Sequence, residues 1–282
     1  SLIVGHRDEV ADRLPRLAVV FGGRSTEHAI SCVTAGSVLA AIDRDRYDVV
    51  PIGITREGRW VLPTADPATL AIRDGRLPEV SASESSVALA VDPTRRGLVV
   101  HDPQSVPQLL TGVDVVFPLL HGPFGEDGTI QGLLELAGVP YVGAGVFASA
   151  AAMDKHYMKL VLVGSGLPDI PHVVVRPHEW DADKAAVRES VASLGFPVFV
   201  KPARGGSSIG ISKVHGPGDL DKAIELARES DPKVIVEAMV EGREVEVGVL
   251  EGVDGGRPDV SVPAEILVRG GSEFYDFDAK YL

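Results

Sequence analysis

A short apolar segment that ends in two glycines constrains the fold of this chain most. Residues 17–21 are consecutively apolar, which is typical of a buried strand, and Gly22-Gly23 indicates a tight turn directly after it. Apolar residues then recur at helical spacing up to Ala41, and Ser25 is suited to cap that helix. A buried strand that leads through glycines into a helix predicts a parallel sheet covered by helices.

The same alternation of strand and helix continues to about Gly145. The predicted elements are strands at 48–54, 113–120 and 139–142 and a helix at 130–137. The chain between Pro63 and Pro107 is polar and rich in turn residues, so we interpret it as a peripheral excursion. These alternating elements predict an α/β domain, residues 1–150, with a doubly wound parallel sheet.

Beyond this point the order of elements changes. Helices are predicted at 147–163, 181–194 and 219–228, and strands at 172–175, 196–201, 209–214, 233–240 and 243–250. Strands that follow one another through short loops form antiparallel hairpins. The second part of the chain is therefore expected to be a separate α+β domain that begins at about residue 151.

Composition excludes several classes of protein. Lys and Arg number 27 and Asp and Glu number 40, so the net charge of −13 disfavours nucleic acid and anionic membranes as partners. The longest run of small and apolar residues, 144–153, is shorter than the about 20 residues that span a bilayer. The single cysteine, Cys32, excludes an internal disulfide and a multi-thiolate zinc site. We expect a cytoplasmic protein that binds neither nucleic acid nor membranes.

A loop rich in glycine and serine is the first candidate site. Lys201 ends a predicted strand, and residues 205–210 follow it before the next strand. The N–H groups and hydroxyls of such a loop can hold a polyphosphate together with a fixed cation. The loop is not a P-loop, because its lysine precedes the glycines and no helix follows them. A flexible hairpin with a surface lysine is the alternative interpretation.

Other polar residues are candidates because of where they stand. Lys155 lies on the helix that opens the second domain, and Glu237 and Glu244 lie at strand ends. All three also have a simpler interpretation as solvated charges. His121 follows a strand at the edge where parallel sheets bind ligands. Glu27, in the first turn of a helix, is explained equally well by the helix dipole.

Residues 143–148 match the dinucleotide pattern G-x-G-x-x-A. That pattern also requires an acidic residue at the end of the next strand, and none ends the predicted strand 172–175. A nicotinamide-binding protein is therefore a weaker alternative.

Seven segments of the chain match, in the same order, the motifs of one known family. They are residues 20–28 with Ser31, 120–132, 153–155, 196–202, 206–210, 274–276 and 280–281. In this combination the chain resembles the D-alanine–D-alanine ligases, the ATP-grasp enzymes that make the dipeptide of bacterial peptidoglycan precursors. The resemblance implies an N-terminal α/β domain at 1–150, a central ATP-grasp domain at 151–250 and the start of a C-terminal ATP-grasp domain at 251–282.

The resemblance implies a reaction in two steps. ATP phosphorylates the carboxylate of one D-alanine, and the amine of a second D-alanine displaces phosphate from the acylphosphate. By position, Glu27 and His121 would hold the first D-alanine. Ser207 and Tyr281 would act with Glu27 to orient the attacking amine and to close the loop that carries Lys280 over the site. The residues that would bind ATP are Lys155, Lys201, Gly206, Ser207, Ser208, Glu237, Val240 and Glu244.

The resemblance also bears on substrate choice, metal and assembly. Relatives that make D-alanine-D-lactate generally lack the Lys-Tyr pair, so Lys280 and Tyr281 favour an amino acid as the second substrate. The family's metal ligands come from a segment after this loop, so none is assigned in this chain and they are expected beyond Leu282, in a longer natural polypeptide. The family implies ATP with two Mg²⁺ ions, or Mn²⁺ in their place, and a homodimer.

Two alternatives stay open. One is another ATP-grasp carboxylate-amine ligase, including a variant with D-lactate or D-serine as the second substrate. The other is a nucleotide-binding module without catalysis. Phosphate release from ATP in the presence of D-alanine separates a ligase from a binding module.

Overall fold

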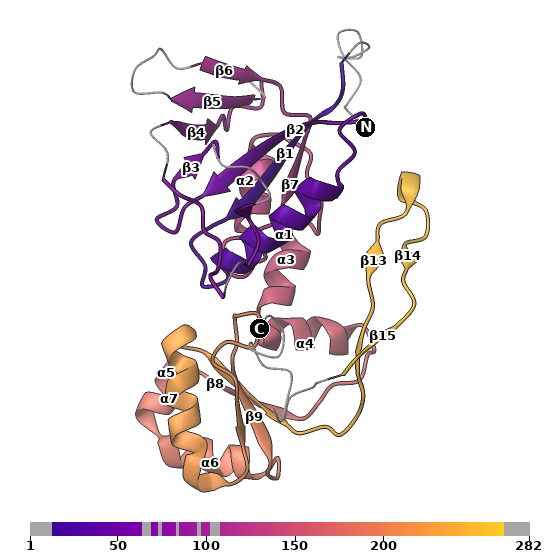
Figure 1. The fold of residues 1–282 in the computed structure, drawn as a ribbon. Coiled ribbons are helices and arrows are strands. Elements are labelled where there is room, and N and C mark those ends of the chain that lie inside the picture. Colours follow the sequence, from indigo (N-terminus) through magenta and orange to yellow (C-terminus); the bar gives the residue numbers. More distant parts are fainter. Residues whose placement is uncertain are drawn as a thin grey trace. The chain divides into compact units, whose positions relative to one another are not determined.

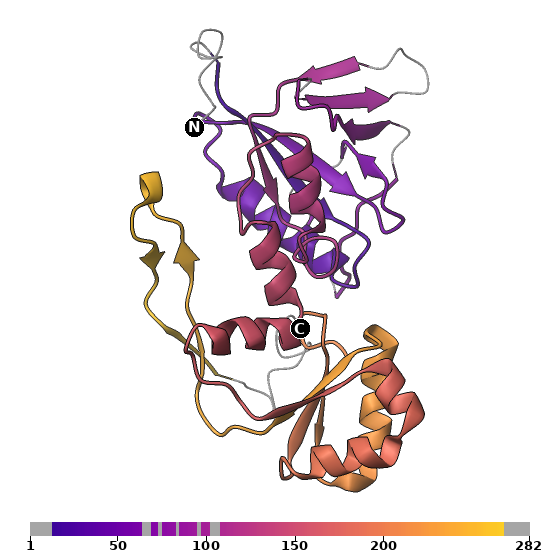
Figure 2. The same ribbon diagram turned by 180° about the vertical axis from the view of Figure 1, so that it is seen from behind.

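The computed structural model describes residues 13–63, 69–72, 75–82, 85–94, 97–101 and 108–267. The chain divides into two compact units, Ser1–Asp154 and Lys155–Leu282 (Figure 1, and from behind in Figure 2). Each unit has its own sheets and its own hydrophobic core.

The first unit is built on a four-stranded sheet in the order β3-β2-β1-β7. Its strands are β1 (Arg16–Gly22), β2 (Asp48–Ile54), β3 (Trp60–Val61) and β7 (Val115–Pro118). β1 runs parallel to β2 and to β7, with Val20 opposite Ile52 and Pro118, and β3 is antiparallel at the edge. After Arg16, β1 is apolar because it is central and buried on both faces. The predicted parallel sheet is confirmed.

Two helices cover opposite faces of this sheet, as the two views show (Figures 1 and 2). Phe21 of β1 packs with Cys32 of α1 (His28–Ala41), whereas Val20 packs with Ile130 and Leu134 of α2 (Thr129–Leu136). Successive side chains of a strand point to opposite faces, so one strand serves two cores. With a helix on each face, the sheet has the predicted doubly wound arrangement. A further helix, α3 (Val146–Met153), ends the unit.

Two expectations for the first unit were wrong. The predicted excursion contains β4 (Ser86–Leu89) and β5 (Gly97–His101), which form an antiparallel sheet with β6 (Gln108–Thr111). Val87 and Leu98 are buried in the same core as Val20, so the polar sequence around them hid a structured sheet. Residues 139–142 do not form a strand, since Tyr141 makes an isolated parallel bridge to Val116.

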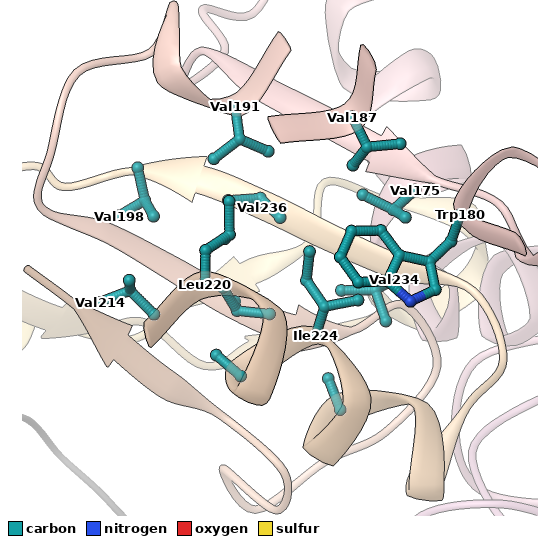
Figure 3. Close-up of a cluster of buried hydrophobic side chains, with 13 residues drawn as sticks. Val175, Trp180, Val187, Val191, Val198, Val214, Leu220, Ile224, Val234 and Val236 are labelled. Atoms are coloured by element: carbon teal, nitrogen blue, oxygen red, sulfur yellow. The ribbon is translucent and has the colours of Figure 1, made fainter. Parts of the chain in front are cut away.

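The second unit contains an antiparallel sheet in the order β10-β9-β11-β8. The strands are β8 (His172–Val175), β9 (Val198–Pro202), β10 (Ser212–Val214) and β11 (Val234–Ala238), and the helices beside them are α5 (Pro177–Ala182), α6 (Lys184–Ala192) and α7 (Leu220–Ser230). Figure 3 shows Val191 of α6 and Leu220 and Ile224 of α7 against one face of this sheet. Trp180 is fully buried there, and its Nε1 donates to Glu225 Oε1 at 2.8 Å. The predicted α+β fold is confirmed.

Two helices that the sequence predicted as continuous are interrupted. The predicted helix 147–163 is α3 followed by α4 (Lys155–Gly164), because Asp154 has an extended backbone with φ −92° and ψ 105°. The predicted helix 181–194 is broken at Asp183, whose carboxylate accepts the N–H groups of Ala185 and Ala186 and so caps α6. Aspartate favours such caps over helix interiors.

Short ribbons follow β11. β12 (Glu244–Glu246) pairs with β15 (Ala264–Ile266), and β13 (Val249–Leu250) pairs with β14 (Asp259–Val260), so the predicted strand 243–250 is two strands. Single 3₁₀ turns occur at Pro217–Asp219 and Val253–Gly255. Within the described residues, every helix is too short or too polar to cross a membrane.

Candidate functional site

The first cluster of predicted site residues lies where β1 and β7 end. Ser31 of α1 joins the two strand ends, because its Oγ accepts the N–H of Gly22 at 2.7 Å and donates to the carbonyl of Leu119 at 2.6 Å. Gly22 has φ +88°, and a Cβ at this position would lie 2.3 Å from the carbonyl oxygen of Ile54. Only glycine therefore allows the turn after β1 to pass this close to β2.

Ser25 has a different role from the one predicted. Helix α1 begins at His28, Glu27 is its N-cap, and the serine makes no cap to the helix. Instead, the Ser25 hydroxyl accepts the N–H of Glu27 at 3.1 Å and donates to the carbonyl of His121 at 2.7 Å. It thereby ties the two predicted substrate-binding residues together through their backbones.

Glu27 and His121 are brought together by this arrangement. Glu27 is 3% exposed, and its Oε2 lies so close to Gly122 that a Cβ there would be 2.2 Å away. Gly122 has φ +71°, so glycine is required for its backbone conformation as well as for space. The His121 ring is oriented by Thr34 of α1, whose Oγ1 lies 3.1 Å from His121 Nε2.

A cavity of about 180 Å³ opens beside this cluster. Ser25 and His121 contribute to its wall, and most of the remaining wall is apolar, including Trp60, Leu120 and Ile130. The cavity therefore lies at the carboxyl edge of the parallel sheet, on the side of α2, where folds of this kind bind ligands.

The second cluster lies in the second unit, where α4 begins beside the loop after β9. The N–H of Lys155 donates to the carbonyl of Ala203 at 2.9 Å, and its Nζ donates to the carbonyl of Gly205 at 2.8 Å. The helix start and the Gly-Ser loop are thus joined at two points. Lys155 is held next to the loop that the sequence identified as a phosphate site.

The Gly-Ser loop has an unusual backbone. Ser207 and Ser208 have φ of 48° and 59°, in the left-handed region that non-glycine residues rarely adopt, and Gly210 has φ 70°. Turns of this kind can direct backbone N–H groups into an anion-binding concavity. The loop is anchored at its start by the buried Asp231, which accepts N–H bonds from the backbone and guanidinium of Arg204.

Lys201 and Glu237 lie side by side on neighbouring strands. Lys201 pairs with Ile235 and Glu237 with Phe199 in the β9–β11 register, which places both charged side chains on the face opposite the core of Figure 3. Lys201 Nζ donates to Glu237 Oε2 at 2.5 Å. Burial opposes the Glu237 charge, but the neighbouring Lys201 and Lys159 together outweigh it and hold the pKa of this carboxyl below its ordinary value.

The structure adds residues that sequence reasoning missed. Lys159 of α4 is 6% exposed and forms ion pairs with Asp169 at 2.7 Å and with Glu237 at 2.9 Å. Burial opposes the Lys159 ammonium, and its hydrogen bonds to the two carboxylates raise its pKa above the ordinary value. One signal was available, because Lys159 stands four residues after Lys155 and so on the same side of a helix. Nothing in the sequence pointed to Thr34.

The described structure places none of the remaining predicted site residues in either cluster. Val240 is 61% exposed, and Glu244 is exposed on β12. Lys280 and Tyr281 lie outside the described residues. The dinucleotide-like segment begins α3 at Val146, and a bridge at Tyr141 precedes it where the pattern requires a strand. In the described parts of the chain, no group of three or more His, Cys, Asp or Glu side chains is arranged to hold a metal ion.

The chain is similar to one group of known proteins over most of its length. Residues 16–144 match the family model described as "D-ala D-ala ligase N-terminus", and residues 161–282 match the model described as "D-ala D-ala ligase C-terminus". A D-alanine–D-alanine ligase from Streptomyces griseus is 58% identical over 278 residues, which are 96% of this chain and 71% of the relative. One from Mycobacterium sp. strain KMS is 60% identical over 273 residues, 95% of this chain and 72% of the relative.

Solved structures give the same result. The VanG D-Ala:D-Ser ligase from Enterococcus faecalis superposes with a TM-score of 0.76 at 35% identity and covers 94% of this chain and 72% of its own. The D-alanine–D-alanine ligase from Coxiella burnetii has a TM-score of 0.73 at 30% identity, with 92% and 73% covered.

Proposed function

Because this chain belongs to the D-alanine–D-alanine ligase family, we propose that it uses ATP to join two D-alanine molecules into D-alanyl-D-alanine for peptidoglycan synthesis. The reaction passes through an acylphosphate. A terminal oxygen of the first D-alanine's carboxylate attacks the γ-phosphorus of ATP, and ADP leaves. The amine nitrogen of the second D-alanine then attacks the acyl carbon, phosphate leaves, and the amine loses a proton.

The observation that carries this proposal is the lysine arrangement around the Gly-Ser loop. Lys155 Nζ binds the loop at Gly205, and Lys201 stands on the strand that leads into it. Phosphoryl transfer needs fixed positive charge and backbone donors around the transferring group rather than covalent chemistry. We propose that the phosphates of ATP bind to Lys155, Lys201 and the loop residues Gly206, Ser207 and Ser208. The adenine and ribose would bind to Glu237, Val240 and Glu244.

The first D-alanine is assigned to Glu27 and His121. A carboxylate that is 3% exposed attracts the ammonium group of an amino acid strongly, because little water screens the pair. Thr34 and Ser25 keep the histidine at a constant distance from that carboxylate through the bonds described above. This cluster would hold the first substrate while its carboxylate is phosphorylated.

Ser207 and Tyr281 are proposed to orient the second amine together with Glu27. The backbone of Ser207 is strained, with φ 48° in the left-handed region. Such strained residues cluster at active sites, which supports a functional role for this serine. Closure of the loop that carries Lys280 and Tyr281 would keep water from the acylphosphate. Both of those residues lie outside the described part of the chain.

The second substrate is the finer point of specificity. One solved relative is a D-Ala:D-Ser ligase, so D-serine is the alternative to D-alanine. We propose D-alanine, and we expect Tyr281→Phe to shift selectivity toward D-lactate by up to about tenfold, which is the value of one hydrogen bond. Product ratios in a competition of D-alanine, D-serine and D-lactate measure this. An unchanged ratio would remove Tyr281 from the selectivity argument.

Further parts of the proposal rest on the family. Mg²⁺ would accompany ATP, and we assign it no ligand because the described residues hold no suitable cluster. We also propose a homodimer, a cytoplasmic location and a division into domains at about residues 150 and 250. Analytical ultracentrifugation tests the dimer.

Phosphate release with ATP and D-alanine tests the function. The chain spans about 71% of the Streptomyces griseus relative, so the assay compares this chain with one lengthened by that relative's C-terminal segment. We expect at least one of the two proteins to release phosphate and to form D-alanyl-D-alanine. Lys201→Met should abolish both products, whereas Lys222→Met, on the exposed side of α7, should have no effect. ATP binding without phosphate release in both forms would leave a nucleotide-binding module.

A further inference from the structure

Lys159 is a buried cation that the proposed reaction does not use. Its side chain is 8% exposed, and its Nζ lies 2.7 Å from Asp169 Oδ1 and 2.9 Å from Glu237 Oε1. Asp169 is held in turn by the N–H of Ile170 at 2.8 Å. A buried lysine with two carboxylate partners is held in place, because moving away from them would leave its own buried charge without a partner.

Glu237 is the point where two lysines meet. Its Oε1 accepts from Lys159, and its Oε2 accepts from Lys201. The two lysines differ in their surroundings, since the Lys201 side chain is 24% exposed and also lies 5.6 Å from the ring of Phe199. Lys201 is therefore the partner that is able to move toward a ligand, and Lys159 is the one that stays.

Binding of ATP would require one mobile lysine, Lys201, and one fixed lysine, Lys159. If Lys201 turns toward a phosphate, the Glu237 carboxylate loses one of its two cations while it is still 7% exposed. A buried carboxylate without a partner is unfavourable, and Asp169 adds a second negative charge within reach of the same ammonium. A second, fixed cation lowers the cost of releasing the first.

We propose that Lys159 is a positioning residue that keeps Glu237 compensated, so that Lys201 is free to leave Glu237 for the phosphates of ATP. The inference rests on the proposed nucleotide site and deepens it. It requires the effect of Lys159 to depend on the phosphates of the ligand. A lysine that merely shaped the nucleoside pocket would affect adenosine and ATP alike.

Lys159→Met tests this with two ligands, Mg²⁺–ATP and adenosine, in calorimetric titrations of the full chain. We expect ATP to bind about 10- to 100-fold more weakly, the consequence of leaving a buried charged group unpaired. Adenosine should change by less than about threefold, because Lys201 does not leave Glu237 when no phosphate is present. Lys159→Gln, which removes the charge but keeps a polar group, is a second variant expected to give the same result.

Two controls isolate the charge of Glu237. Lys222→Met removes an exposed lysine on α7 and should change neither affinity. In the Glu237→Gln background, Lys159→Met should have no further effect on the ratio of ATP to adenosine affinity, because the introduced glutamine carries no charge that Lys201 could leave behind. Thermal melting confirms that each variant is folded.

The outcomes are distinguishable. A ratio that Lys159→Met leaves unchanged, or one that falls equally in the Glu237→Gln background, would overturn the inference while ATP binding by the unaltered chain still supports the proposed function. No binding of ATP by the unaltered chain would overturn both.

Discussion

The hydroxyl of Ser25 donates to the carbonyl oxygen of His121 at 2.7 Å and so joins two turns that lie 96 residues apart in the sequence. The Ser25 Oγ also accepts the N–H of Glu27 at 3.1 Å. One small side chain therefore sets the spacing between the carboxylate and the imidazole that we assign to the first D-alanine.

Ser25→Ala should lower kcat/KM for D-alanine by up to about tenfold, since the hydrogen bonds of one hydroxyl contribute about 0.5 to 1.5 kcal/mol. The change should appear mainly in KM, because the serine positions the binding residues and does not reach the transferring phosphate. Phosphate release at varied D-alanine concentration measures both constants. The neighbouring Thr26 is exposed, and Thr26→Ala serves as the control. Equal effects of the two substitutions would contradict the role of Ser25.

Gly122→Ala should displace Glu27 and reduce ligase activity by more than tenfold. A methyl group at this position would lie 2.2 Å from Glu27 Oε2, and φ of +71° is unfavourable for alanine by about 1 kcal/mol or more. Gly132→Ala is the matched control, because Gly132 lies in α2 with nothing within 4 Å of the added carbon. We expect that control to keep its activity and to gain up to about 1 kcal/mol of stability. Retained activity in Gly122→Ala would show that Glu27 is not where D-alanine binds.

His28 should make the stability of the first unit depend on pH. The ring is fully buried, its Nδ1 lies 2.7 Å from the carbonyl of Gly23, and its Nε2 accepts the N–H of Val80 at 3.0 Å. Both bonds are satisfied by the neutral ring with its proton on Nδ1. Burial lowers the pKa of His28 below its ordinary value of 6.5, which the carbonyl of Gly23 offsets only in part.

The lowered pKa of His28 determines how the stability of the first unit changes with pH. The unfolded chain binds a proton at His28 more readily than the folded chain, so the free energy of unfolding falls as the pH drops from 6.5 to the lower folded pKa. Urea unfolding between about pH 8 and about pH 5 should show this slope, and His28→Gln should make it shallower. Identical slopes in the two proteins would contradict the buried neutral histidine.

Asp231→Asn should loosen the Gly-Ser loop and destabilise the second unit by about 2 kcal/mol, because hydrogen bonds to a charged acceptor contribute about 1.5 to 3 kcal/mol. Asp231 is 2% exposed and accepts from Arg204 through its N–H, Nε and Nη2, and from the N–H of Lys233. The urea midpoint gives the stability and KM for ATP gives the effect on the loop. The exposed Asp219 makes no side-chain cap to α7, so Asp219→Asn should change neither.

Local patterns were sufficient for most of the fold. The apolar run before Gly22 predicted a central strand, and the valine-rich segments around Val200 and Val236 predicted the strands of the second sheet. The helix breaks at Asp154 and Asp183 were missed because a single aspartate changes the periodic pattern of a segment little, although Asp183 caps the start of α6. The sheet of β4, β5 and β6 was missed because its strands are short and stand among turn residues.

The sequence by itself determined which residue types stand at the ends of the strands and in the loops, and their order identified the family. Only the tertiary structure decided which of them meet. Ser25 looked like a helix cap and instead binds His121, and Lys159, which the sequence did not single out, lies between Asp169 and Glu237. The physical reason is that capping, periodicity and turn preference act over a few residues, whereas these partners are brought together from distant segments by the packing of the core.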